Sequence, residues 1–277
     1  MQIGQALRDA KARLQAVSAT PRLDAELLLG AVLNRDRAWL LAHDNDPLDS
    51  SSLQAFENYL VHRAQGEPVA YLLGMQEFWS LPLQVNRHTL IPRPDTEVLV
   101  ETTLRLAPEN ACRILDLGTG TGAIALALQH ERPDWQVVAV DRIAEAVALA
   151  KCNAERLALP VECLQSDWFN AVSGCVFDVI VSNPPYIDPL DRHLQGDGVK
   201  CEPLSALVAE QEGLADLQKI VGEAPKFLIN EGLLAVEHGH AQGEIVRRLF
   251  EDAGFCDIQT HLDYGGQPRV TSGIYCE

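Results

Sequence analysis

The chain has 277 residues and a formal net charge of −17 at pH 7; 47% of its residues are hydrophobic and 22% are charged. This length suits one large or two modest domains with a substantial core, and the composition is that of an ordinary globular protein. A chain this acidic, with no run of Lys or Arg, would repel a phosphate backbone, so we expect no direct binding of nucleic acid. The acidity fits either solubility alone or attraction to a basic partner.

The cysteines and the apolar segments bear on the compartment. No apolar run reaches the roughly 18 residues that cross a bilayer, and the first residues lack the apolar core of a signal peptide. The seven cysteines are scattered and never spaced Cys-x-x-Cys. This argues against a disulfide framework and a zinc site, and predicts that most cysteines are small buried residues. We expect a cytoplasmic monomer with no membrane partner and no metal.

Residues 1–75 predict a small helical domain. Apolar residues recur at helical spacing from Ile3 onward, and a third amphipathic stretch reads SSLQAFENYLVHRAQGEP. Between them, Thr20 and Pro21 have the features of an N-cap and a first helical residue. No strand signal interrupts this part of the chain.

Residues 76–97 predict a hairpin and a linker. Alternation in FWSLPLQV indicates a short hairpin or an edge strand, since Pro82 excludes the centre of a sheet. Arg93 then lies between two prolines in IPRPDTE, which predicts a stiff extended loop before the helix TEVLVETTLRL. This loop serves either as a linker or as a wall of an active site.

Residues 98–277 predict an α/β domain. Buried strands are expected at 113–117, 136–141, 161–167, 177–182 and 232–239, and helices at 122–130, roughly 143–158, roughly 205–224, and 242–254. Such alternation is typical of a doubly wound, mostly parallel sheet, and the last two strands predict an antiparallel hairpin at one edge. Gly265-Gly266-Gln267 is interpreted as the turn of that hairpin.

The segment LDLGTGTGAIALAL follows a strand and opens a helix. Its loop, Gly118-Thr119-Gly120-Thr121-Gly122, permits a tight turn and a close approach of a ligand to the backbone. The alternating glycines after Asp116 favour S-adenosylmethionine. However, Gly118, Gly120 and Ala123 also satisfy the G-x-G-x-x-A pattern of NAD-binding loops, and a packing turn without ligand is a third interpretation.

Two acidic residues follow the next two strands. Asp141 closes the second strand, where a carboxylate can accept hydrogen bonds from both hydroxyls of a ribose. Asp167 and Trp168 close the third strand, where the first can bind an adenine amine and the second can cover the adenine ring or the sulfonium. Trp168 can equally be a core residue.

The fourth strand ends at Asn183-Pro184-Pro185-Tyr186, because proline cannot continue a central strand. The side-chain oxygen of Asn183 and the carbonyl of Pro184 can each accept one hydrogen of a planar NH₂ group, and Tyr186 offers a face for stacking. Two fixed acceptors orient a poor nitrogen nucleophile and favour the positive charge that grows as a methyl arrives. We therefore expect methyl transfer to an amide or an exocyclic amine.

In this order the glycine loop, Asp141, Trp168 and Asn-Pro-Pro-Tyr resemble class I methyltransferases that act on planar amines of DNA, ribosomal RNA or protein glutamine. LIPRPDTE and SNPPYI, with RILDLGTGTGAIALAL and CEPLSALVAEQEGL behind a helical domain, resemble the release factor glutamine methyltransferase family over essentially the whole chain. The resemblance implies a Rossmann-like fold with a seven-stranded sheet. It also implies transfer of a methyl from S-adenosylmethionine, with S-adenosylhomocysteine as product. The acceptor would be N5 of the glutamine in the Gly-Gly-Gln loop of class I peptide chain release factors.

The resemblance implies roles for named residues. Gly118 to Gly122, Asp141, Trp168 and Asn183 would bind the methyl donor, together with Asp167. Asn183, Pro184, Pro185 and Tyr186 would hold the glutamine, with Asn183, Pro184 and Tyr186 catalytic and Arg93 on the substrate side. The helical domain would dock the protein substrate. DYGGQPRV departs from what we expect of the family at the C-terminal end.

Three other functions are weighed against this one. A nucleic-acid amine methyltransferase shares the tetrapeptide, but the acidic balance and the lack of a basic recognition segment count against it. A module that binds the donor and a termination factor without catalysis is disfavoured by the intact Asn183. A NAD-dependent dehydrogenase lacks a residue set suited to hydride transfer.

Overall fold

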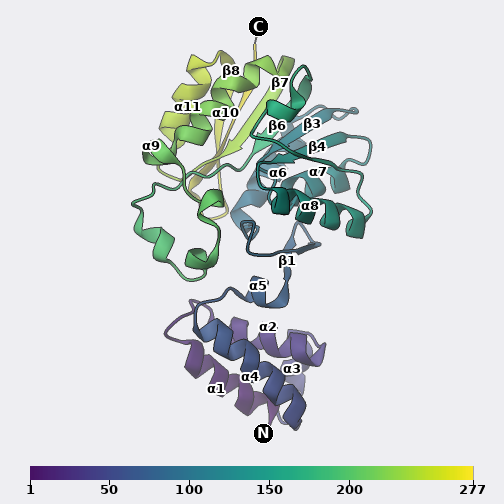
Figure 1. The fold of residues 1–277 in the computed structure, drawn as a ribbon, viewed down its shortest axis with the longest axis vertical. Helices are drawn as coiled ribbons and strands as arrows, with labels where there is room; N and C mark the ends of the chain where they lie inside the picture. Colours follow the sequence, from purple (N-terminus) through teal and green to yellow (C-terminus); the bar gives the residue numbers. More distant parts are fainter. Residues whose placement is uncertain (277) are drawn as a thin grey trace. The chain divides into compact units, whose positions relative to one another are not determined.

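The computed structural model describes residues 1–276, which form two compact units (Figure 1). The smaller unit comprises Met1–Met75 together with Arg192–Cys201, and the larger unit comprises Gln76–Asp191 and the chain from Glu202 onward. The segment Arg192–Cys201 was expected in the α/β domain, so its membership of the smaller unit differs from the prediction. Among the described residues, no helix is long and apolar enough to cross a membrane.

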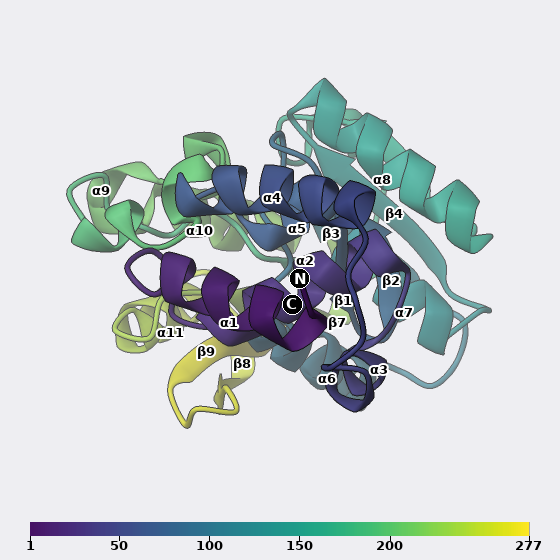
Figure 2. The ribbon, with the colours of Figure 1, turned by 90° about the horizontal axis from the view of Figure 1, so that it is seen from below.

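The smaller unit is helical. It contains α1 (Ile3–Leu14), α2 (Pro21–Leu33), α3 (Arg37–Ala42), α4 (Ser50–Ala64) and α5 (Val69–Leu73). The helices α1, α2 and α4 pack on one another around a core that includes Leu14, Leu28 and Phe56 (Figure 2). These three helices confirm the predicted ones, whereas α3 and α5 were not predicted. They have six and five residues, too few to show a helical repeat of apolar positions.

A buried arginine connects separate parts of the smaller unit. Arg63 in α4 is 4% exposed; its Nε donates to Asp24 of α2 at 2.7 Å, and its Nη2 donates to Asp197 at 2.7 and 2.8 Å. Burial acts to lower the pKa of Arg63, but the two carboxylates outweigh it, so the pKa is raised. Removing the guanidinium would leave the carboxylate of Asp24, itself 6% exposed, without its charged partner.

We expect Arg63→Ala to lower the free energy of unfolding by about 3–5 kcal/mol, because it strands a buried charge. The matched control is Arg13→Ala, which removes an exposed ion pair with Glu57 and should cost under about 1 kcal/mol. Chemical denaturation followed by circular dichroism measures both. Equal losses in the two variants would contradict the structural role of Arg63.

The larger unit is built on a seven-stranded sheet in the order β5-β4-β3-β6-β7-β9-β8. Its strands are β3 (Arg113–Leu117), β4 (Gln136–Asp141), β5 (Glu162–Gln165), β6 (Phe177–Ser182), β7 (Leu228–Glu237), β8 (Phe255–Leu262) and β9 (Pro268–Tyr275). All neighbours pair in parallel except β7 with β9 and β8 with β9, which are antiparallel. The predicted doubly wound sheet with a C-terminal hairpin is confirmed.

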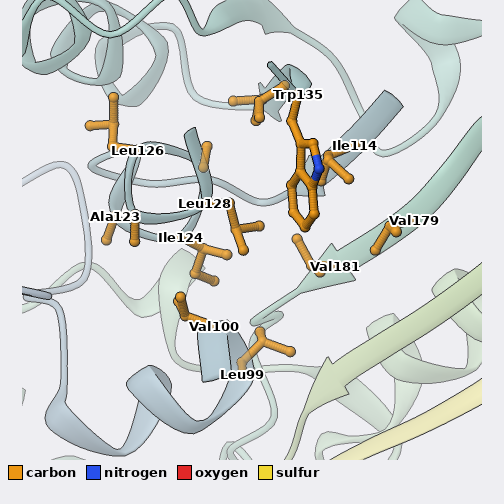
Figure 3. Packing of buried hydrophobic residues seen from close by; sticks show 14 of the residues in the cluster. Leu99, Val100, Ile114, Ala123, Ile124, Leu126, Leu128, Trp135, Val179 and Val181 are labelled. Atoms are coloured by element: carbon orange, nitrogen blue, oxygen red, sulfur yellow. The ribbon is translucent and has the colours of Figure 1, made fainter. Parts of the chain in front are cut away.

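Helices cover both faces of the sheet because alternate strand residues point to opposite sides. On one face, Ile114 and Val179 pack under α6 (Glu97–Leu106), α7 (Ala123–Glu131) and α8 (Ala144–Leu157), and Figure 3 shows part of this layer around Trp135. On the other face, strand residues that include Leu115 and Ile180 pack under α10 (Ala215–Glu223) and α11 (Gly243–Asp252). The two apolar layers hold the strand ends in fixed positions.

A separate two-stranded sheet precedes α6. It pairs β1 (Met75–Phe78) with β2 (Leu81–Gln84), as the hairpin prediction expected. The turn residues Trp79 and Ser80 both have positive φ, of 52° and 59°, which suits a two-residue hairpin turn. The following IPRPDTE is extended only as far as Arg93, because Pro94–Thr96 form a 3₁₀ turn (η1) that leads directly into α6.

The region 205–224 was predicted to be one helix, which is wrong. It contains a 3₁₀ turn at Leu204–Ala206, the four-residue α9 (Glu210–Gly213) and then α10. Gln211, Glu212 and Gly213 all have positive φ, so a continuous helix is impossible there. A glycine at this position was visible in the sequence, but the two preceding left-handed residues carry no sequence signal.

The cysteine prediction also needs correction. Cys256 in β8 and Cys276 just beyond β9 form a disulfide, because the antiparallel pairing of these strands brings their Cα atoms to 6.2 Å. Cys112 and Cys163 are buried as expected, but Cys152 is exposed, and Cys175 and Cys201 are partly exposed. The Gly265-Gly266-Gln267 sequence lies in the turn between β8 and β9, so the turn prediction is confirmed.

Candidate active site

A cleft lies at the carboxyl ends of the parallel strands, where β3 is flanked by β4 and β6. Ligands bind at this position in open α/β sheets because the chain leaves the central strands in opposite directions there. The predicted residues that line the cleft are Gly118, Thr119, Gly120, Thr121, Asp141, Asp167, Trp168, Asn183 and Pro185. Four other predicted residues are not among the lining residues: Arg93, Gly122, Pro184 and Tyr186.

The glycine loop has a backbone that requires glycine. Gly118, Gly120 and Gly122 have φ values of 74°, 57° and 85°, a region that residues with a Cβ rarely adopt. A Cβ on Gly120 would meet no atom closer than 3.9 Å, so the backbone there borders open space in the cleft. A Cβ on Gly122 would lie only 3.0 Å from Leu126, so this glycine serves the close packing at the start of α7.

Two carboxylates hold the loop. Asp116, fully buried in β3, accepts a hydrogen bond from the Thr119 hydroxyl at 2.6 Å, and burial raises its pKa to about 7. Asp141 at the end of β4 accepts from the backbone N–H of Gly120 and of Ile143, both at 2.9 Å. Burial raises the pKa of Asp141, while these backbone hydrogen bonds oppose the rise. Each Asp141 oxygen keeps a lone pair that can face the cleft.

Trp168 lies beside the loop in an unusual conformation. Its φ is 49°, a left-handed value that costs a residue with a side chain about 1–2 kcal/mol. The Ser166 hydroxyl donates to the Trp168 carbonyl at 2.7 Å, which helps to hold this backbone. Trp168 is 8% exposed, and its ring lies 3.5 Å from where a Cβ on Gly118 would be. Trp168 is therefore both a core residue and a cleft residue, whereas Asp167 is exposed and lies 3.5 Å from Lys219.

Asn183 follows the last residue of β6 and lines the cleft. Its side-chain nitrogen Nδ2 donates to the hydroxyl of Thr96 at 3.1 Å. This hydrogen bond uses one hydrogen of the amide NH₂ and leaves the oxygen Oδ1 to accept from a different partner. The amide therefore has a defined polarity in the cleft wall.

Hydrogen bonds fix both the hydroxyl and the backbone carbonyl of Tyr186. The hydroxyl donates to Oε1 of Glu237 at 3.1 Å, and burial raises the pKa of Tyr186. The Tyr186 carbonyl accepts from Nε2 of Gln242 at 3.0 Å and contacts Gly213 closely. This support differs from the stacking surface that the sequence predicted, because the ring belongs to the apolar layer under α10 and α11.

Arg93 does not point into the cleft. Its guanidinium bonds to the Glu202 carboxylate, which also accepts from the backbone N–H of Ile91 at 3.1 Å. Burial raises the pKa of Glu202, and the charge of Arg93 opposes that rise. The neighbours Pro92 and Thr96, not Arg93, line the cleft, so this loop forms a wall through other residues than the one predicted.

Sequence reasoning missed several lining residues. They come from the linker before α6, from the start of α8, from the end of β5 and from the loop after β6: His88, Thr89, Leu90, Pro92, Thr96, Ile143, Ser166, Ser205 and Ala206. Those of the linker precede or fall within LIPRPDTE, a segment that had been singled out as a possible wall. Ser205 and Ala206 fall within CEPLSALVAEQEGL, which was quoted for the family resemblance but not as part of a site. Ile143 and Ser166 belong to no such motif, and backbone geometry brings them to the cleft.

We expect Gly213→Ala to destabilise the larger unit by about 2 kcal/mol or more, because φ is 81° and the new Cβ would overlap the Tyr186 carbonyl oxygen. Gly222→Ala is the control, since no atom lies within 4 Å of its Cβ and it sits in α10; that change should be neutral or stabilising by about 0.5–1 kcal/mol. Thermal unfolding measures both. A neutral Gly213→Ala would show that this contact does not position Tyr186.

Comparison with families and known proteins gives consistent matches. Residues 5–74 match the PrmC N-terminal domain, and residues 94–195 match the methyltransferase small domain. A release factor glutamine methyltransferase of Escherichia coli strain K12 is 53% identical over 97% of this chain and 97% of its own length. The protein of the same name from Pseudomonas aeruginosa is 51% identical over 92% of this chain and 93% of its own.

Solved structures share the fold at low sequence identity. A methyltransferase from Pyrococcus furiosus has a TM-score of 0.57 and 18% identity, covering 80% of this chain and 100% of its own. A Thermus thermophilus 16S ribosomal RNA N2 G1207 methyltransferase, solved with AdoMet and guanosine, has a TM-score of 0.52 and 22% identity, covering 73% and 49%. These two likenesses confirm the methyltransferase fold class.

Proposed function

The chain belongs to the release factor glutamine methyltransferase family, and from this we propose that it methylates class I peptide chain release factors. The reaction moves a methyl group from S-adenosylmethionine to the side-chain N5 of the glutamine in their Gly-Gly-Gln loop. The observation that carries the proposal is Asn183, which lines the cleft with its amide nitrogen occupied by Thr96. Its oxygen is then the group that a substrate NH₂ can meet.

The residues of the cleft fit the donor. Gly120 borders open space, so the loop backbone can approach a ligand closely, and Asp141 beside it has lone pairs for two ribose hydroxyls. We assign donor binding to these residues with Thr119 and Thr121, and to four more: Gly118, Gly122, Asp167 and Trp168. Asn183 adjoins both the donor and the acceptor. The bound donor supplies an electrophilic methyl on a sulfonium and leaves as S-adenosylhomocysteine.

The chain's own contribution is to orient a weak nucleophile. The glutamine amide nitrogen is delocalised into its carbonyl, so it reacts only when its lone pair is aimed at the methyl carbon. Asn183 Oδ1 and the Pro184 carbonyl would each accept one N–H, which fixes the NH₂ plane and favours the positive charge that develops. The nitrogen forms its bond to the methyl carbon as the carbon–sulfur bond breaks, and one proton then leaves to water.

We assign the remaining predicted roles on the same basis. Pro185 and Tyr186 shape the pocket of the glutamine side chain, Tyr186 through its hydrogen bond to Glu237, and Arg93 holds the wall through Glu202. Docking of the protein substrate is assigned to the helical domain, residues 1–75, with residues 76–97 as hairpin and linker. Residues 98–277, apart from Arg192–Cys201, are assigned as the catalytic domain. We place this enzyme in the cytoplasm as a monomer.

Two substitutions should separate acceptor positioning from donor binding. Asn183→Ala should lower kcat by about 100-fold or more while donor affinity changes little, because it removes one fixed acceptor of the NH₂ group. Asp141→Ala should instead weaken donor affinity by roughly tenfold or more, through lost hydrogen bonds to a charged group. Calorimetric titration of the donor and steady-state rates measure the two effects. Undiminished turnover in Asn183→Ala would refute its role.

The substrate is tested directly with labelled donor and purified class I release factors. One release factor carries the natural Gly-Gly-Gln sequence and the other has its glutamine changed to alanine. Label should enter only the first, and peptide mass spectrometry should place it on that glutamine. Equal labelling of both proteins would reject the substrate assignment, and label on Gln267 of the enzyme itself would overturn its interpretation as a turn residue.

A further inference from the structure

A buried polar group lies directly behind Asn183. Ser182 pairs with Val236 in the parallel β6–β7 ladder, so Asn183 and Glu237 follow at the same level of the sheet. Thr96, at the end of the 3₁₀ turn before α6, contacts the Asn183 amide. Thr96 is 4% exposed and Glu237 is 1% exposed, and neither belongs to the residues predicted from sequence. A carboxyl group buried this deeply requires an explanation.

Two hydrogen bonds and one close approach connect these residues. Asn183 Nδ2 donates to Thr96 Oγ1 at 3.1 Å, and Tyr186 donates to Glu237 Oε1 at 3.1 Å. The other oxygen of Glu237, Oε2, is buried without a hydrogen-bond partner, and the nearby Thr96 hydroxyl acts to lower the pKa of this carboxyl group. Thr96 therefore accepts from Asn183 and lies beside a carboxylate oxygen that lacks a donor.

The number of available hydrogens determines which group donates and which accepts in each hydrogen bond. A threonine hydroxyl has one hydrogen, and an ionised carboxylate can only accept. When Thr96 gives its hydrogen to Glu237, its oxygen has only lone pairs for Asn183. The asparagine must then present its NH₂ to Thr96, and its Oδ1 must face the cleft.

On this basis, and resting on the proposed function, we propose that Thr96 and Glu237 are positioning residues that set the orientation of the Asn183 amide. Reversed, the amide would present its own NH₂ to the substrate NH₂, two donors facing each other with no acceptor between them. The correct orientation cannot come from the shape of Asn183, because its amide oxygen and nitrogen are nearly equal in size. It has to come from the hydrogen-bond partners.

Charged and titratable groups from four segments surround Glu237. Arg269 of β9 favours the ionised carboxylate and Asp95 of the 3₁₀ turn disfavours it, while Tyr186 donates from the loop after β6. His238, next in the chain, bonds to Thr271 and has its pKa lowered by burial, so it adds no charge near pH 7. Burial is the largest influence, and it raises the pKa of Glu237 to about 7. The protonation of Glu237, and with it which groups donate and which accept between Glu237 and Asn183, therefore changes with pH near neutrality.

The first experiment reads the amide itself and needs no substrate. In nuclear magnetic resonance spectra of the full chain, the Asn183 side-chain NH₂ should show one proton protected by its bond to Thr96. Thr96→Val should remove that protection, and Thr96→Ser should restore it. Thr103→Val is the control, because its buried hydroxyl bonds only to the Leu99 carbonyl in α6. Asn183 signals unchanged in Thr96→Val would overturn the proposal.

The second experiment measures rates with a release factor as substrate. Thr96→Val should lower kcat by about 10- to 100-fold, with the KM of the donor within about twofold, while Thr96→Ser should keep most of the activity and Thr103→Val all of it. The wild-type kcat should rise with pH through about 7 as Glu237 ionises, and Glu237→Gln should lose this dependence. A purely structural role of Thr96 would lower stability without altering the pH profile.

The outcomes separate this proposal from the proposed function. If the wild-type protein labels no release factor, the proposed function fails. The resonance signals of the Asn183 amide then still test whether Thr96 and Glu237 set the orientation of that amide. If the wild-type protein is active and Thr96→Val matches Thr96→Ser in kcat and pH profile, the positioning role is refuted while the function stands.

Discussion

The register of the central strands is the constraint on which the site depends. Leu117 pairs with Val140 on one side and with Ser182 on the other, and Ser182 pairs with Val236. The next residue on each strand therefore falls in one row across the sheet: Asp141, Gly118, Asn183 and Glu237. Four residues far apart in the sequence become neighbours through backbone hydrogen bonds alone. A slip of one residue in β6 would turn Asn183 to the other face and bury its amide in an apolar layer.

This row and the residues next to it concentrate features that work against stability. Asp116 and Glu237 are carboxyl groups taken almost completely from water, and burial raises the pKa of both to about 7. Trp168 has a left-handed backbone angle, which is costly for a residue with a Cβ, whereas the loop glycines adopt such angles without strain. Such costs persist where the surrounding structure enforces them, and here the apolar layers on both faces of the sheet do so. The strain and the buried charge therefore lie where a ligand would have to be held in one geometry.

The sequence predicted the structure well where neighbouring residues alone determine it, and poorly where distant strands have to meet. Strands β3, β4 and β6 match their predicted bounds, because a parallel sheet covered on both faces leaves short apolar runs that end in glycine, aspartate or proline. Asn183 and the glycine loop were recognisable as motifs. Thr96 and Glu237 were not, since a threonine before a helix and a glutamate at the end of a strand are common. The β6–β7 pairing brings Glu237 level with Asn183, and the turn before α6 brings Thr96 to the Asn183 amide. The Cys256–Cys276 disulfide was missed for the same reason, because it depends on how β8 meets β9.

The ion pair between Arg63 and Asp197 joins residues 134 positions apart within the smaller unit. During synthesis on a ribosome, the helices α1 to α5 emerge long before the segment Arg192–Cys201 that completes their unit. Until then Arg63 has Asp24 as its carboxylate partner and lacks the second. A fragment that ends at residue 75 would remain in that unfinished state permanently. The smaller unit is thus discontinuous in the sequence, and the chain must be translated as far as Cys201 before its amino-terminal helices can reach their final structure.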